Sequence, residues 1–138
     1  MTDLYAFLHP ETPGQKEVVL SRFKKEDGSV DAFIIKPLTA EENDALIKRC
    51  TITTKDRGGE RRRIDSTKYM KAIIVAATVH PDFRDERLCD AYGVVDPILV
   101  VGKMLLAGEQ TKLADEILTL SGLSVVSDDL RCLPSLPF

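Results

Sequence analysis

The sequence predicts an α+β fold: a small antiparallel sheet from two hairpins, packed with a helical C-terminal half, with about five helices in all. Two turn signals between β-prone runs, Asp27-Gly28 and Gly58-Gly59, predict the hairpins. Start and stop signals for helices follow one another from Val79 to Leu120 and predict the helical half. At 138 residues, 43% of them hydrophobic, the chain is long enough for one core.

The whole chain is expected to form one domain with an extension at each end. Four large apolar residues within five positions, Leu4, Tyr5, Phe7 and Leu8, precede two prolines, so residues 1–15 are expected to form an arm. This arm either folds back on the core or reaches a neighbouring molecule. Residues 18–37 and 51–65 are the expected hairpins of a folded core over residues 16–122. Residues 123–138 end in an apolar, Pro-interrupted run and are expected to form an extended tail.

Two helices are expected in and after the sheet region. The pattern from Thr39 to Glu42 is a capping box, so a helix should begin at Ala40. A second, longer helix is expected from Ser66 to about His80, where Pro81 stops it. Apolar residues cover more than half of its circumference, so this helix should be central.

Three short helices are expected to follow in tandem. Asp82 and Asp85 supply acceptors for the free amides at the start of the first, and Gly93 suits its end. Asp96-Pro97 is a typical start for the second. Gly108 is expected to separate the second helix from the third. No polar catalytic group falls on the apolar faces, which favours a binding role over a catalytic one.

Composition narrows the class of protein. The net charge of −3 argues against a dedicated nucleic-acid binder. No apolar run is long enough to span a membrane, and the N-terminus lacks a secretory signal pattern. The three cysteines are far apart in sequence, which is neither a disulfide framework nor a metal-ligand spacing. A reducing, cytoplasmic setting is therefore expected.

The sequence offers no catalytic, cofactor-binding or metal site. His80 lies near Asp82, Asp85 and Glu86, but helix capping explains these aspartates, and neither histidine has a partner at metal-binding helical spacing. Gly58-Gly59 lacks the Gly-Lys-Ser/Thr ending of a phosphate loop. We therefore expect no catalytic residue, no metal and no cofactor.

The second hairpin is unusually basic. Its five cations are candidates for contact with a polar partner or a nucleic acid: Lys55, Arg57, Arg61, Arg62 and Arg63. Strand alternation places Arg62 on the face opposite Arg61 and Arg63. Three readings stay open: a solvated hairpin, a site for an acidic protein partner, or, least favoured, a phosphate-backbone contact.

Apolar residues of the last two helices are candidates for binding a partner helix. The candidate residues are Ile98, Val101, Met104, Leu105, Leu113, Ile117 and Leu120. A protein that holds an amphipathic client helix needs such a surface. The alternative is that these side chains form the core of the chain itself.

Taken together, several landmarks resemble the phage tail assembly chaperones of the XkdN-like family. They run in order over about residues 4–120. The landmarks are Tyr5-Ala6-Phe7-Leu8-His9-Pro10, Pro37-Leu38-Thr39-Ala40-Glu41-Glu42, Lys68 to Val79, His80-Pro81-Asp82-Phe83, Tyr92-Gly93-Val94, and Met104-Leu105-Leu106-Ala107-Gly108-Glu109. His80 and Phe83 depart from the usual choices of that family, conservatively for packing.

The resemblance implies a non-enzymatic role in a bacterial host that carries the phage or prophage. Proteins of this family bind the tape measure protein, limit its aggregation and help to recruit tail tube subunits. The resemblance thus implies a tape measure partner, a further contact with the tail tube protein, and a homo-oligomer. It also implies a place in the host cytoplasm and not in the mature virion, with no membrane partner.

Two other functions stay open at this point. One is a structural tail or baseplate interaction protein. The other is a nucleic-acid-binding regulator that uses the basic hairpin of residues 55–63. The first would be found in the virion, and the second would bind DNA in a salt-dependent manner.

Overall fold

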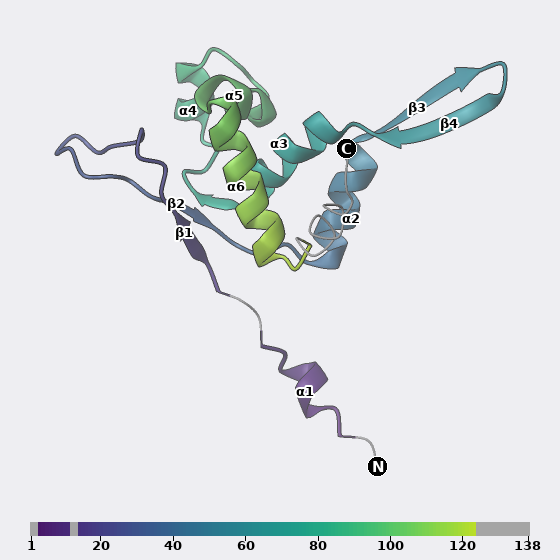
Figure 1. Ribbon diagram of the computed structural model, residues 1–138, viewed down its shortest axis with the longest axis horizontal. Coiled ribbons are helices and arrows are strands. Elements are labelled where there is room, and N and C mark those ends of the chain that lie inside the picture. Colours follow the sequence, from purple (N-terminus) through teal and green to yellow (C-terminus); the bar gives the residue numbers. More distant parts are fainter. Residues whose placement is uncertain (1–2, 12–13, 124–138) are drawn as a thin grey trace.

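A computed structural model describes residues 3–11 and 14–123 of the chain. It contains small antiparallel sheets and short helices, with a helical C-terminal half, so the predicted α+β fold is confirmed (Figure 1). Most of the predicted tail lies outside the described residues. The elements in chain order are α1 Tyr5–Leu8, β1 Lys16–Val18, β2 Phe33–Ile35, α2 Ala40–Arg49, β3 Thr51–Asp56, β4 Gly59–Ile64, α3 Ser66–Ala77, β5 Thr78–His80, α4 Glu86–Ala91, α5 Pro97–Met104 and α6 Ala107–Leu120.

The strands form two separate sheets. One has three antiparallel strands in the order β1-β2-β5, and the other is the β3-β4 hairpin alone. Both predicted hairpin regions are present, with Gly28 and Gly59 at the positive φ angles that such turns require. The hairpin β3-β4 projects away from the rest of the molecule (Figure 1). The two predicted hairpins therefore do not share a sheet.

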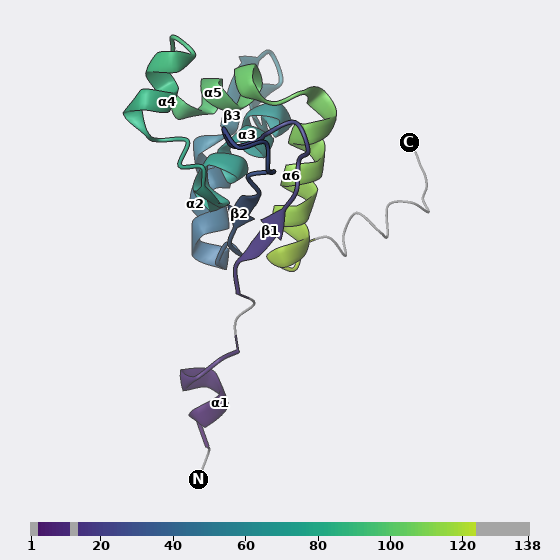
Figure 2. The ribbon, with the colours of Figure 1, turned by 90° about the vertical axis from the view of Figure 1, so that its left-hand side faces the viewer.

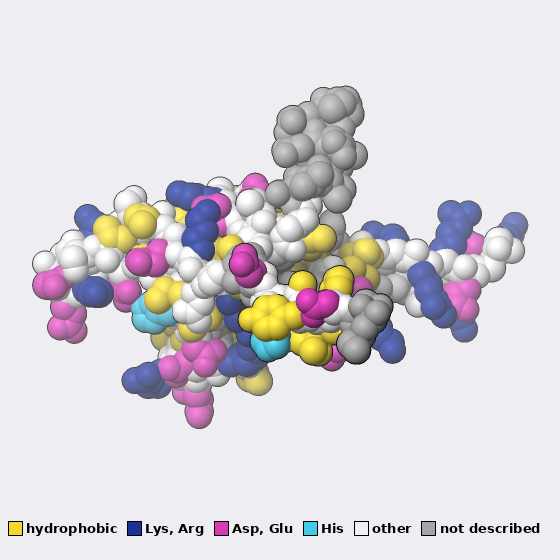
Figure 3. Space-filling view, turned by 90° about the horizontal axis from the view of Figure 1, so that it is seen from below, with side chains coloured by type: hydrophobic (Ala, Val, Ile, Leu, Met, Phe, Trp, Pro, Cys, Tyr) yellow, Lys and Arg dark blue, Asp and Glu magenta, His cyan; other side chains and the backbone are white. Residues whose placement is uncertain are grey.

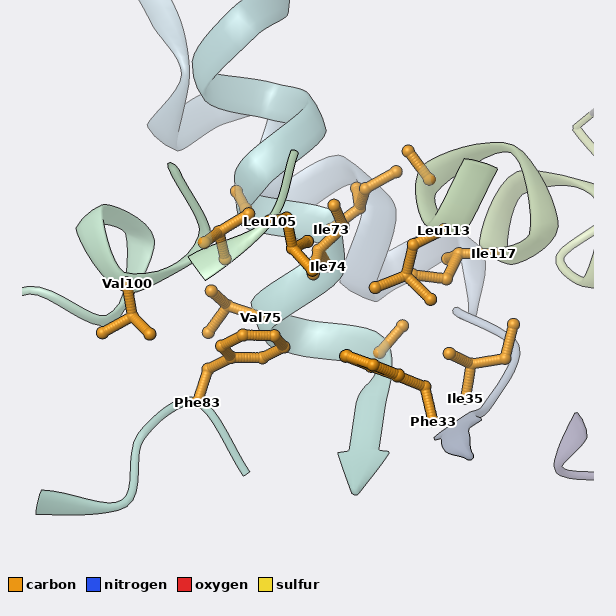
Figure 4. Close-up of a cluster of buried hydrophobic side chains, with 14 of the residues drawn as sticks. Phe33, Ile35, Ile73, Ile74, Val75, Phe83, Val100, Leu105, Leu113 and Ile117 are labelled. Atoms are coloured by element: carbon orange, nitrogen blue, oxygen red, sulfur yellow. The ribbon is translucent and has the colours of Figure 1, made fainter. Parts of the chain in front are cut away.

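Helix α3 is the centre of the fold. It contacts α2, α5 and α6, and five of its twelve residues are buried. Its Ile73 and Ile74 meet Leu113 and Ile117 of α6 on one side, and Phe83 and Val100 lie in the same cluster (Figure 4). The predicted central position of this helix is confirmed.

The end of α3 differs from the prediction. The helix stops at Ala77 and not near His80, because residues 78–80 form β5 and pair with β2. Val79 lies on this strand, and 41% of its surface is exposed. Hydrogen bonding to a distant strand thus overrides the local helical pattern.

Start signals agree with the structure more closely. Thr39 and Glu42 make the complete capping box at α2, and Asp96 accepts a hydrogen bond from Ile98 N–H at 3.0 Å ahead of Pro97. Gly93 takes a φ of +68°, as expected at a helix end. Gly108 was expected to separate two helices, which is wrong, because it lies in the first turn of α6.

Candidate protein-interaction site

The seven candidate partner residues lie mainly inside the molecule. Val101, Leu113 and Ile117 have no exposed surface, because α5 and α6 pack these faces against α3. Met104 and Leu105 are also buried, while Ile98 and Leu120 are half-buried at the edge of the core. In this conformation the seven side chains are core or core margin, which was the alternative reading of their pattern.

Other apolar side chains face outward around the same helices. Val95 is 95% exposed, and Leu99 and Leu106 are half-exposed. Sequence reasoning passed over them because each sits beside residues that are buried, and only the packing of α5 on α3 decides which side faces out.

Among the described residues, the N-terminal arm carries the largest concentration of exposed apolar side chains. Leu4, Tyr5, Phe7 and Leu8 are 54%, 66%, 78% and 69% exposed. All hydrogen bonds recorded for residues 3–11 stay within this segment, including Tyr5 N–H to the Asp3 carboxylate at 2.9 Å. The short helix α1 stands apart from the body (Figures 1 and 2). Figure 3 views the molecule from the side on which α1 lies and shows hydrophobic side chains in the foreground.

Within the arm, local contacts give the short helix its shape. The rings of Tyr5 and His9 stack with centroids 4.3 Å apart, and His9 Nδ1 lies 3.1 Å from the Tyr5 carbonyl oxygen. Four residues make too short a helix to persist without packing. The arm therefore presents apolar side chains that gain stability only when something covers them.

The five candidate cations all lie on the exposed hairpin. Lys55 and Arg57 are near its tip, and the three arginines follow on β4. Arg61 lies opposite Thr54 and Arg63 opposite Ile52, so these two arginines share a face, as strand alternation predicted. Figure 3 shows dark-blue side chains along this projecting ribbon.

The corner between β5 and α4 holds the candidate acid groups. His80 Nε2 lies 3.0 Å from Asp31, and Asp82 and Asp85 accept backbone hydrogen bonds from Arg84 and Arg87 at 2.9 Å. Hydrogen bonds from the Arg87 side chain and backbone lower the pKa of Asp85, which keeps this capping group ionised. Asp85 therefore caps α4 as predicted, whereas Asp82 accepts from an amide in the turn before the helix and does not cap it.

A shallow, solvent-open pocket of about 500 Å³ lies at this corner, which we call the α4 corner. Its lining combines apolar, acidic and basic side chains, with Arg87 ion-paired to Asp85 at 2.9 Å: Val79, His80, Pro81, Asp82, Asp85, Arg87 and Leu88. The described residues contain no group of three or more side chains arranged to hold a metal ion. Cys50 and Cys89 are buried free thiols. Among residues 3–11 and 14–123, no helix has the length and hydropathy needed to cross a bilayer.

Comparison with known proteins gives a consistent picture. Residues 4–130 match the family model described as phage XkdN-like tail assembly chaperone protein. The chain is 31% identical over 134 residues to the phage-like element PBSX protein XkdN of Bacillus subtilis (strain 168), covering 94% of this chain and 90% of that relative. The uncharacterized protein YqbN of the same strain matches at the same identity and coverage.

A solved structure supports the fold. The crystal structure of YqbN superposes with a TM-score of 0.69 at 28% sequence identity, covering 88% of this chain and 98% of that one. The shared fold therefore extends over most of both molecules.

Proposed function

Because the chain belongs to the phage XkdN-like tail assembly chaperone family, we propose that it binds the tape measure protein of its phage or prophage. The match over residues 4–130 is the observation that carries this proposal. The family is one of chaperones and not of enzymes. By holding the long helical client until tail tube subunits arrive, the protein would act in the host cytoplasm and be left out of the virion.

The arm is the surface best suited to the client. Its Leu4, Tyr5, Phe7 and Leu8 are exposed together, and an amphipathic client helix offers the apolar stripe that would cover them. Ile98 and Leu120 are half-buried at the core margin and would lie at the edge of a larger contact. The five buried candidates, Val101, Met104, Leu105, Leu113 and Ile117, would meet a client only if α5 or α6 moved away from α3.

Co-expression with the tape measure protein encoded by the same phage or prophage tests the proposal. We expect the chaperone to increase the soluble fraction of that protein and to co-purify with it. If neither solubility nor co-purification changes, the proposed function is wrong.

Matched variants locate the contact. Leu4→Ser/Phe7→Ser/Leu8→Ser removes apolar surface from the arm, and Val95→Ser/Leu99→Ser removes it from the surface at α5. We expect the first variant to lose at least about tenfold in client affinity, since three large side chains each contribute about 1 kcal/mol or more. The second variant should bind the client with the affinity of the wild type. If instead the second variant loses affinity and the first does not, the client site lies at α5.

Mass spectrometry of purified virions separates this proposal from a structural tail or baseplate role. A chaperone is expected to be missing from the particle. Detection at a stoichiometry comparable to known tail proteins would favour the structural role.

A further inference from the structure

A small hollow lies where α2, α3 and α5 meet. Its volume is about 130 Å³, and it is lined by Arg49, Ala72, Val75, Arg84, Asp96, Pro97 and Ile98. Ala72 and Val75 of α3 are buried and form an apolar wall. Arg49 is the last residue of α2, and Arg84 lies in the turn before α4. Segments far apart in the sequence therefore bring two arginines to one hollow.

The positive charge of this hollow is not compensated by the described residues. No ion pair with another described residue is recorded for Arg49 or Arg84. Asp96, the acidic residue of the lining, caps α5 by accepting a hydrogen bond from Ile98 N–H at 3.0 Å. Two cations against one carboxylate leave a net charge of +1 on the lining, in a chain whose net charge is −3. An anion between the two arginines would therefore be stabilised.

The volume of the hollow limits what this anion is. Pockets that bind small molecules usually measure about 300–1,000 Å³, and this hollow is well below that range. It therefore suits one acidic side chain and not a nucleotide or another bulky ligand. Arginine presents its donors in a fixed fork that matches the two oxygens of a carboxylate.

Exposed apolar side chains lie next to this lining in the sequence. Val95 comes just before the lining residues 96–98 and is 95% exposed, and Leu99 comes just after them and is 50% exposed. Gly102 follows Leu99 by three residues, is also exposed, and lets another backbone approach α5 closely. An uncovered apolar side of α5 thus lies beside a cationic hollow.

We propose that this surface binds an acidic amphipathic helix of a partner protein, with one glutamate or aspartate side chain held between Arg49 and Arg84. Apolar residues of that helix cover Val95 and Leu99. A carboxylate one turn away from them along the partner helix enters the hollow. The apolar contact supplies buried area, and the charged contact selects an acidic partner and fixes its register.

This contact is separate from the proposed client contact at the arm. Helix α5 lies in the upper part of the body and α1 below the body in both Figure 1 and Figure 2. The inference therefore does not rest on the proposed function, and one chain can hold the tape measure protein and the acidic helix at the same time.

A pair of helical peptides tests the proposal. The probe is an alanine-based helix of about 20 residues, acetylated and amidated at its ends, with leucines at i, i+3 and i+7 and a glutamate at i+4. The matched peptide has glutamine in place of that glutamate, which has a similar helix propensity. Fluorescence anisotropy with the full chain should show at least about tenfold tighter binding of the glutamate peptide, because the glutamine peptide lacks the charge-assisted hydrogen bonds.

Variants of the hollow locate the site. Arg49→Gln/Arg84→Gln should bind the glutamate peptide at least about tenfold more weakly than the wild type and should no longer distinguish the two peptides. Arg49→Lys/Arg84→Lys keeps both charges but loses the fork, so several-fold weaker binding is expected. Both arginines are exposed, so both variants should fold. If circular dichroism shows otherwise, Arg84→Gln alone, in a turn, should still reduce the preference for glutamate.

Two controls separate this site from net charge and from the arm. Lys24→Gln/Lys25→Gln removes two exposed cations from the segment between β1 and β2 and should keep the wild-type affinity for both peptides. Leu4→Ser/Phe7→Ser/Leu8→Ser should keep the preference for the glutamate peptide, whether or not the arm binds the tape measure protein. Failure of one proposal therefore leaves the other standing.

Four results overturn the proposal. The first two are equal binding of both peptides and binding of neither. The third is a loss in the Lys24→Gln/Lys25→Gln control as large as that in Arg49→Gln/Arg84→Gln. The fourth is full affinity of Arg49→Lys/Arg84→Lys, because net charge alone would then attract the peptide.

Discussion

At the scale of residues, Arg22 and Glu109 tie the segment after β1 to the start of α6. The guanidinium Nε and Nη2 donate to the Glu109 carboxylate at 3.0 and 2.6 Å, and Nη2 also donates to the Met104 carbonyl at 2.7 Å. Glu109 in turn accepts from Leu106 N–H at 2.8 Å and so caps α6, where Leu106 offers no side-chain acceptor. One carboxylate thus serves both a helix start and a long-range contact.

This carboxylate gives stability a dependence on pH. Hydrogen bonds from Arg22, and then from the Leu106 backbone, lower the pKa of Glu109 below its ordinary value of 4.5. A lowered pKa in the folded state means that the stabilisation is complete above about pH 4.5 and is lost as pH falls through the folded pKa.

We therefore expect Glu109→Gln to lower the free energy of unfolding by about 1 kcal/mol at pH 7, since an amide caps less well than a carboxylate. The difference from wild type in the free energy of unfolding should narrow as pH falls below about 4.5, because the wild-type carboxyl becomes protonated. Urea unfolding at several pH values measures it, with exposed Glu26→Gln as a control that should change little. A difference in the free energy of unfolding between Glu109→Gln and the wild type that does not change with pH would contradict this account.

At the scale of elements, beginnings of helices were predicted better than ends of helices. The signals at Thr39 and Asp96 are local, because a side chain caps amides two or three residues away, and the structure confirms both. The end of α3 depends on pairing with β2, more than forty residues earlier, and no local pattern specifies it. Gly108 was wrongly predicted to separate two helices. A glycine lowers helix stability little when it lies in a first turn that Glu109 caps.

The hairpin provides a prediction at this scale. Replacing residues 53–62 by Asn-Gly joins Ile52 to Arg63, which are already cross-strand partners. Because the excised side chains are exposed, the free energy of unfolding should change by less than about 1 kcal/mol. Thermal unfolding followed by circular dichroism measures this. A loss of several kcal/mol would show that the hairpin supports the body.

At the scale of the whole molecule, one apolar cluster joins the three-stranded sheet to α3, α5 and α6 (Figure 4). The sequence predicted that the helix beginning at Ser66 is central, and Ile73 and Ile74 of that helix are fully buried in the cluster. It did not decide whether Val101, Leu113 and Ile117 face a partner or the core, because that depends on which helices meet in space. The separation of the arm from the body was likewise left open.

Ile74→Asp tests the unity of this cluster. Its side chain has no exposed surface, and an unpaired carboxylate there should cost more than about 4 kcal/mol, enough to unfold the domain or make it insoluble. Far-ultraviolet circular dichroism and the soluble yield provide the measurement. Thr67→Asp, an exposed change in the first turn of the same helix, is the control and should stay folded. A soluble, fully helical Ile74→Asp variant would show that Ile74 does not lie in the core.

Helix α3 continues directly into β5 with no intervening loop, so insertions and deletions at this joint should not be tolerated. One residue inserted at this joint would turn the helix by about 100° relative to its neighbours or move every side chain of β5 to the other face of the sheet. Length variation among homologues should therefore avoid Ala77-Thr78 and collect at the hairpin tip and in the arm. Homologues should therefore tolerate insertions and deletions in these two projections, while the number of residues in the central segment stays constant.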